Sequence, residues 1–170
     1  FFDCGIQGQG ILEDKENTTH VYYIYPMRFN AQKAGISRSL FVKAVNAEYP
    51  LAEGYESIPM TEGYVKPLYL NPIYQEKIAI GSKGFPFNYN KGVEYNYDKG
   101  ICPVAEKMHY EEFICTPIVR KPLTIKNMKD FVDVIKKVLL NVEDLKKAFP
   151  KNDEMKIFSP VQAAADSKVR

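Results

Sequence analysis

Residues 20–29 read HVYYIYPMRF, an aromatic and β-branched run that predicts a strand. Alternation divides its side chains between two faces, with His20, Tyr22 and Ile24 on one and Val21, Tyr23 and Tyr25 on the other. Pro26 cannot donate a ladder hydrogen bond, so we expect it at a bulge, at a sheet edge or at the end of the strand. The polar, glycine-containing residues before His20 predict a connection from an apolar segment at the N-terminus.

Downstream, the pattern predicts three helices and a second buried strand. Ser37 is a candidate N-cap for a helix ending near Glu48, and Pro103 is placed to open a helix ending near Phe113. Residues 114–119 predict a short strand. Thr124 caps an amphipathic pattern that continues to Leu145. Residues 49–71 and 81–100 predict irregular loops. We therefore expect an α+β fold, with a small antiparallel or mixed sheet and helices packed mainly on one face.

The composition is that of a globular protein with few special chemical groups. The net charge of +2, from 23 basic and 21 acidic residues, gives no basic surface for nucleic acid. No run approaches the ~20 apolar residues that cross a bilayer, so we expect no membrane partner and a cytoplasmic location. Three cysteines without a CxxC pair predict buried, reduced thiols, and two histidines exclude a histidine-rich metal site.

No catalytic constellation is visible in the sequence. The GIQGQG run at residues 5–10 does not match a dinucleotide-binding GxGxxG and leads towards a strand. Nothing in the spacing favours a nucleophilic pair of Cys4 or Cys115 with His20. Glu111 and Glu112 are expected to be solvated. Each tyrosine is open to two interpretations, as a sugar contact or as a packed residue whose hydroxyl reaches the surface.

Three separated segments carry a family resemblance. They are residues 20–48 (HVYYIYPMRFNAQKAGISRSLFVKAVNAE), 63–75 (GYVKPLYLNPIYQ) and 102–138 (CPVAEKMHYEEFICTPIVRKPLTIKNMKDFVDVIKKV). In this order they resemble the C-terminal domain of the DegT/DnrJ-type sugar aminotransferases. The resemblance covers most of the chain from about Thr19 to Val142. It departs after the first helix, where the family's Gly-Ile-Pro turn is replaced by Glu48-Tyr49-Pro50 and a longer loop.

The resemblance implies one domain of a fold-type I enzyme that uses pyridoxal phosphate. Such enzymes aminate a nucleotide-linked keto-sugar, usually with glutamate as donor, and work as homodimers. The Schiff-base lysine, the acidic partner of the pyridine nitrogen and the phosphate cup belong to a large N-terminal domain. We therefore expect residues 1–146 to be the small domain, 147–170 to be a tail, and the large domain to be missing. Alone, the chain is expected neither to bind cofactor nor to catalyse.

The family's cleft-facing segments match six positions of this chain, the last three of which are Tyr64, Pro67 and Tyr69. The resemblance implies substrate contacts from His20, Tyr22, Arg28, Tyr64 and Tyr69. Two other hypotheses remain open: a stand-alone sugar-nucleotide-binding module without catalysis, and a structural half that pairs with a separately encoded cofactor domain. The start at Phe1, without methionine and inside an apolar segment, favours a fragment.

Overall fold

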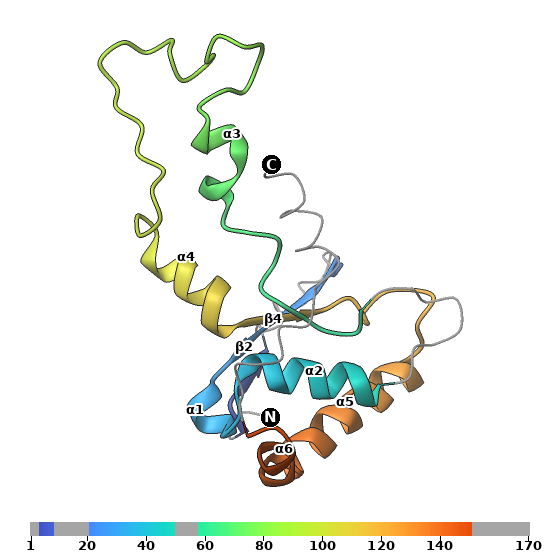
Figure 1. Cartoon of the computed structure of the whole chain (residues 1–170). Coiled ribbons are helices and arrows are strands. Elements are labelled where there is room, and N and C mark those ends of the chain that lie inside the picture. Colours follow the sequence, from blue (N-terminus) through green and yellow to red (C-terminus); the bar gives the residue numbers. More distant parts are fainter. Residues whose placement is uncertain (1–3, 9–20, 50–57, 151–170) are drawn as a thin grey trace, which may run out of the picture.

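A computed structural model describes residues 4–8, 21–49 and 58–150 (Figure 1). The strands in this part of the chain are β1 (Ile6–Gly8), β2 (Tyr25–Phe29), β3 (Thr61–Glu62) and β4 (Phe113–Thr116). They form one antiparallel sheet in the order β1-β2-β4-β3. The predicted α+β class is therefore confirmed, with an antiparallel sheet.

Strand β2 is shorter than the sequence predicts. Residues 21–24 lie outside it, and the rings of Tyr22 and Tyr25 meet edge to face with centroids 5.2 Å apart. Residues three apart point to opposite faces of a strand, so this contact requires the chain to bend before β2. Pro26 is the second residue of β2, not its end, and pairs with Cys115. The described ladder with β1 begins only after this proline, which has no N–H to donate.

Helix α1 (Ala31–Ala34) leads to α2 (Arg38–Glu48), which packs on one face of the sheet. Ser37 caps α2 as predicted, since its hydroxyl accepts a hydrogen bond from the Leu40 N–H at 3.2 Å. Phe41 is fully buried and stacks on Phe29 of β2 with centroids 4.9 Å apart. This pair ties the helix layer to the central strand.

Two helices close the described chain, where the sequence predicts one. Thr124 and Asn127 form a capping box for α5 (Ile125–Leu140), and α6 (Val142–Ala148) follows after a break. At the break, the Asn141 side chain donates to the Lys137 carbonyl at 2.7 Å and takes the place of a helical N–H. The expected domain boundary at 146/147 falls inside α6, and most of the expected tail lies outside the described residues.

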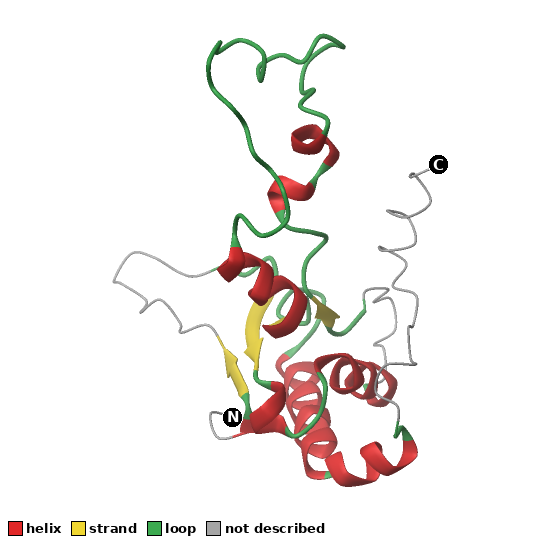
Figure 2. Ribbon diagram, turned by 60° about the vertical axis from the view of Figure 1, so that its left-hand side comes forward, coloured by secondary structure: helices red, strands yellow, loops and turns green. Residues whose placement is uncertain are grey.

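In the described part of the chain, the opposite face of the sheet carries one helix. Helix α4 (Pro103–Lys107) continues without interruption into the π-helical turn η3 (Met108–Glu112). We call residues 103–112 the hub helix. Figures 1 and 2 show it across the sheet from α2, α5 and α6, so the helices do lie mainly on one face. The sequence predicts an α-helix here, and the wider last turn is a departure from that prediction.

Between α2 and the hub helix the chain forms the short strand β3, the turn η2 (Leu68–Leu70) and α3 (Pro72–Gln75). The sequence predicts only loop here. Strand β3 depends on long-range contacts: the Asn46 side chain holds both backbone groups of Met60, at 2.8 and 2.9 Å. Residues 81–100 are irregular, as predicted, apart from one isolated pair between Ile80 and Phe85.

Cys102 and Cys115 are free thiols. Cys115 is buried, as predicted, whereas Cys4 and Cys102 are only half-buried. None of the helices in the described ranges is long and apolar enough to cross a membrane.

Candidate functional site

Three of the residues that the resemblance assigns to the substrate meet the hub helix. Arg28 from β2 binds Glu112, the backbone of Tyr64 after β3 contacts His109, and Tyr69 from η2 binds Glu106. The hub residues Glu106, His109 and Glu112 follow one another at intervals of three. One helix therefore gathers segments that are far apart in the sequence.

The first of these contacts is an ion-pair cluster. The Arg28 Nε donates to Glu112 Oε2 at 2.6 Å, and the Lys107 ammonium lies 3.3 Å from Oε1. The hydrogen bond from Arg28 lowers the pKa of Glu112 more than any other contact does. Only 13% of the Glu112 side chain is exposed, so the prediction that it is solvated is wrong. Arg28 itself is 55% exposed, and its cation can still meet an anionic ligand.

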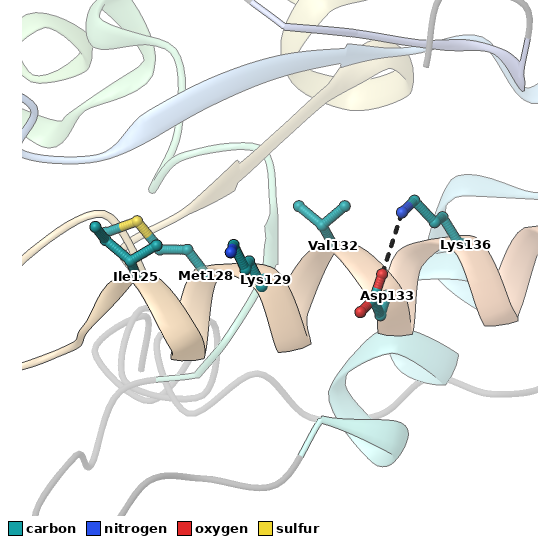
Figure 3. Close-up of a pocket in the computed structure, with 6 residues that line it drawn as sticks. All are labelled: Ile125, Met128, Lys129, Val132, Asp133 and Lys136. Atoms are coloured by element: carbon teal, nitrogen blue, oxygen red, sulfur yellow. Dashed lines mark hydrogen bonds and ion pairs between the residues drawn. The ribbon is translucent and has the colours of Figure 1, made fainter.

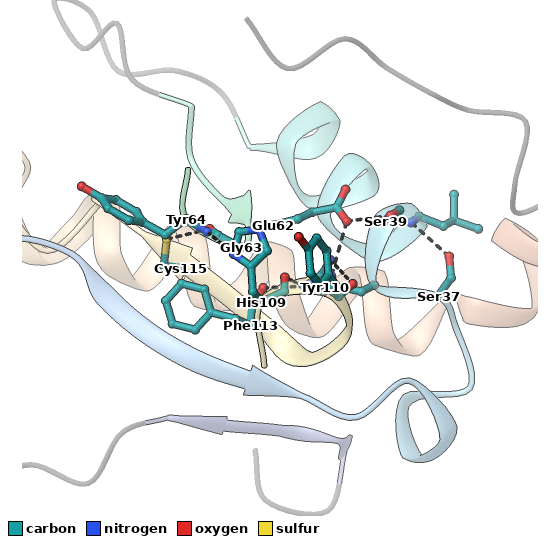
Figure 4. A network of polar contacts seen from close by, with 11 residues as sticks. Ser37, Ser39, Glu62, Gly63, Tyr64, His109, Tyr110, Phe113 and Cys115 are labelled. Carbon is teal, nitrogen blue, oxygen red and sulfur yellow. Dashed lines mark hydrogen bonds and ion pairs between the residues drawn. The ribbon is translucent and has the colours of Figure 1, made fainter. Parts of the chain in front are cut away.

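The second contact depends on close packing between Gly63 and His109 (Figure 4). Gly63 has φ +62°, and a Cβ there would lie 2.9 Å from His109 Cε1. The following N–H, of Tyr64, points at His109 Nδ1 at 3.5 Å, which requires Nδ1 to be unprotonated. Burial, followed by the nearby Arg38 charge, lowers the pKa of His109 and favours this neutral form.

Arg38 fixes the end of the hub helix. Its guanidinium donates to the carbonyls of His109, Tyr110 and Phe113 at 2.9, 2.6 and 3.1 Å. It also forms an ion pair with Glu62 at 3.4 Å. The π-helical turn leaves carbonyls without helical partners, and the arginine satisfies them. Burial lowers the pKa of Arg38, and the Glu62 carboxylate opposes that shift.

The third contact, between Tyr69 and Glu106, involves a buried tyrosine. Tyr69 is buried, and its hydroxyl donates to Glu106, which also accepts the Gly100 N–H at 2.6 Å. Burial is the main reason that the pKa of Tyr69 is raised to about 12, while the tyrosine hydroxyl lowers the pKa of Glu106. Because its hydroxyl is already bonded, Tyr69 fits the packing interpretation better than direct contact with a sugar.

Tyr64 and Tyr23 form the exposed aromatic part of the site. Tyr64 is 50% and Tyr23 66% exposed, and the polar interaction with Tyr23 is the main cause of the raised pKa of Tyr64. The Arg120 guanidinium carbon lies 5.3 Å from the centre of the Tyr23 ring. Val65, next to Tyr64, has φ +46°, a strained conformation for a β-branched residue.

The remaining predicted residues do not join this group among the described contacts. Tyr22 is half-buried against Tyr25, and His20 lies outside the described residues. Sequence reasoning missed Tyr23, which it placed on the face opposite Tyr22, and the hub residues. The signal for the hub residues was the spacing of three in the run Glu106, His109, Glu112.

The exposed side chains of this group are suited to binding. Two phenols, an imidazole and two guanidinium groups can hydrogen-bond to hydroxyls, stack on a ring and attract a phosphate. Within the described ranges no three His, Cys, Asp or Glu side chains are grouped to hold a metal ion.

No protein-family model matches the chain. A search of curated proteins finds no match either.

Proposed function

We propose that this chain is the substrate-side small domain of a pyridoxal-phosphate-dependent aminotransferase that aminates a nucleotide-linked keto-sugar. The observation that carries the proposal is the convergence of Arg28 and Tyr64 on the hub helix. Both residues come from segments of the family resemblance, and the hub helix is itself the third such segment. Both side chains are exposed, and the hub helix contacts both segments.

The residues of this chain do not fit the cofactor. A Schiff-base lysine works from a desolvated pocket, and no lysine of the described residues is buried. Pyridoxal phosphate would supply the electron sink for amino transfer. We propose that a separate cofactor domain supplies it, that glutamate is the amino donor, and that the whole enzyme is a homodimer. Its location would be the cytoplasm, where cysteines stay reduced.

In this arrangement the chain binds and orients the sugar. The Tyr23 and Tyr64 rings provide apolar faces and hydroxyls, and Arg28 provides a cation for an anionic group. The hub helix holds these side chains in place: Glu112 orients the Arg28 guanidinium, and His109 with Gly63 fixes the backbone of Tyr64. Neither Arg28 nor Tyr64 has to move a proton.

Chemical-shift mapping of the ¹⁵N-labelled chain tests this surface. We expect uridine diphosphate glucose to shift backbone signals of Arg28, Tyr23, Tyr64 and residues 103–112, with uridine diphosphate alone separating the nucleotide from the sugar contribution. Tyr64→Phe should weaken the sugar-dependent shifts, whereas Tyr89→Phe, which changes an exposed tyrosine outside this surface, should not. Shifts confined to other regions, or none, would contradict the proposed substrate surface.

A further inference from the structure

Residues 76–101 form a long projection that we call the arm. Figures 1 and 2 show it extending from α3 and returning to α4, away from the sheet and from α2, α5 and α6. It contains no regular helix or strand, yet its two ends are fastened together. The Gln75 side-chain amide donates to the Tyr69 and Tyr97 carbonyls at 2.8 and 2.7 Å, and Gly100 binds Glu106 of the hub helix.

A small aromatic cluster organises the arm from inside. Phe87 meets three tyrosine rings near edge to face, with centroid distances of 6.3, 5.7 and 6.1 Å, from Tyr74, Tyr95 and Tyr97. Tyr74 and Tyr97 approach to 5.2 Å. Such contacts stabilise beyond the area that they bury, so the arm has a preferred shape of its own.

The tip of the arm, residues 77–93, presents a second set of side chains to solvent. Its exposed apolar residues are Ile78, Ile80, Phe85, Tyr89 and Val93. The backbone pair of Ile80 with Phe85, and the Phe85–Tyr89 ring contact at 6.1 Å, place three of them together. The tip also carries three lysines and no acidic residue, which gives it a net charge of +3. It is therefore a preformed cationic knob with an aromatic surface.

The exposed aromatic residues of the tip are typical of a protein-binding surface. Aromatic residues are enriched at the centres of protein interfaces, where a rigid aromatic side chain buries a large area at a low entropic cost. We expect a partner to bind the knob in a recess with acidic residues around its rim, because charge complementarity with the three lysines would favour association.

Two hollows on the described surface do not suit the knob of a second copy. A hollow of about 380 Å³ along α5 is lined by Ile125, Met128 and Val132, but Lys129 and Lys136 stand against one acidic residue, Asp133 (Figure 3). A second hollow, of about 390 Å³, has Arg28 as its charged lining residue. Both would place positive charge against the lysines of the tip.

We propose that the tip of the arm docks into an apolar recess with a carboxylate rim on the cofactor-binding domain. The inference rests on the proposed function, which supplies that domain as the partner. The arm starts directly after residues 63–75 and ends at the hub helix, so docking couples the partner domain to the same elements that hold Tyr64 and Arg28.

Binding between the chain and the cofactor-loaded domain encoded upstream tests the proposal. The variant Ile80→Ser/Phe85→Ser/Tyr89→Ser removes the knob and leaves the inner aromatic cluster intact. We expect its Kd to rise on the order of 30-fold, because clustered aromatic anchors dominate interface affinity. The matched control, Ile125→Ser/Leu140→Ser, removes exposed apolar side chains from α5 and should bind like the wild type.

Charge reversal provides a second measurement. Lys83→Glu/Lys91→Glu should weaken binding most at low salt. The control Lys121→Glu/Lys129→Glu changes one lysine just before α5 and one within it, and should have little effect. Near-ultraviolet circular dichroism of the tyrosines checks that each variant keeps the arm folded.

Three outcomes would overturn the docking proposal. Equal affinity of the knob variant and the wild type for the cofactor domain would overturn the docking proposal. If the joined domains still aminate a keto-sugar in that case, the proposed function survives. Self-association of the wild-type chain that is lost in the knob variant would show that the knob binds a second copy of the chain. An upstream domain that neither binds cofactor nor supports amination would remove the proposed function as well.

Discussion

Arg38→Met tests whether Arg38 holds the end of the hub helix. The guanidinium spans the carbonyls of His109, Tyr110 and Phe113, and only 12% of the Arg38 side chain is exposed. Methionine keeps a similar apolar stem but donates no hydrogen bond. The substitution therefore leaves three carbonyls and the Glu62 carboxylate without their cation.

The loss of stability follows from these contacts. Hydrogen bonds from a charged donor contribute about 1.5 kcal/mol or more each. Two of the three bonds are half-buried and the third is exposed, so we expect the free energy of unfolding to fall by about 3 kcal/mol. For a chain of this length, that corresponds to a fall in Tm of about 6–12 °C.

The assay is thermal unfolding followed by circular dichroism, with Arg28→Met as the matched control. Arg28 also binds a glutamate, but its side chain is largely exposed, and such pairs contribute little to stability. A second readout is specific to the site: because the Arg38 charge lowers the pKa of His109, Arg38→Met should raise that pKa in an NMR titration. Equal Tm values for the two variants, with an unchanged His109 pKa, would refute the role of Arg38.

Three further predictions follow from the same contacts. Gly63→Ala should destabilise the chain by about 1–3 kcal/mol in urea unfolding, through its positive φ and its clash with His109, and the His109→Ala background should relieve part of this loss. Because the pKa of folded His109 lies below its ordinary 6.5, the unfolded chain binds more protons, and stability should fall as the pH drops below that value. His109→Gln should flatten this dependence between about pH 5 and 7. In Tyr69→Phe the pKa of Glu106 should rise towards its ordinary value in a carboxyl NMR titration, and an unchanged pKa would contradict the hydrogen bond.

The helix starts are predicted well from the sequence because they depend on local hydrogen bonds. Ser37 and Thr124 each bind backbone N–H groups within three residues, so their capping roles depend only on neighbouring sequence. The break at Asn141 escaped prediction because the apolar period continues through it, while the side chain bonds to a carbonyl of the preceding turn.

The candidate site was harder to predict from the sequence than the fold, because contacts between residues far apart in the chain assemble it. The spacing of Glu106, His109 and Glu112 acquires meaning only when β2 and the end of β3 lie beside the hub helix. Tyr22 and Tyr25 were wrongly assigned to opposite faces because a period of two was extended to residues that bend before the strand begins. No local pattern indicates such a bend.

Glutamate-dependent amination of a nucleotide-linked keto-sugar tests the central claim most directly. The chain would be assayed joined to the proposed cofactor domain, and each part would be assayed alone. We predict amino-sugar formation by the joined protein and none by either part, with a higher KM for the keto-sugar when Tyr64 is changed to Phe. A joined protein without a cofactor lysine and without amination, beside a chain that binds the sugar nucleotide alone, would contradict the aminotransferase and favour a binding module.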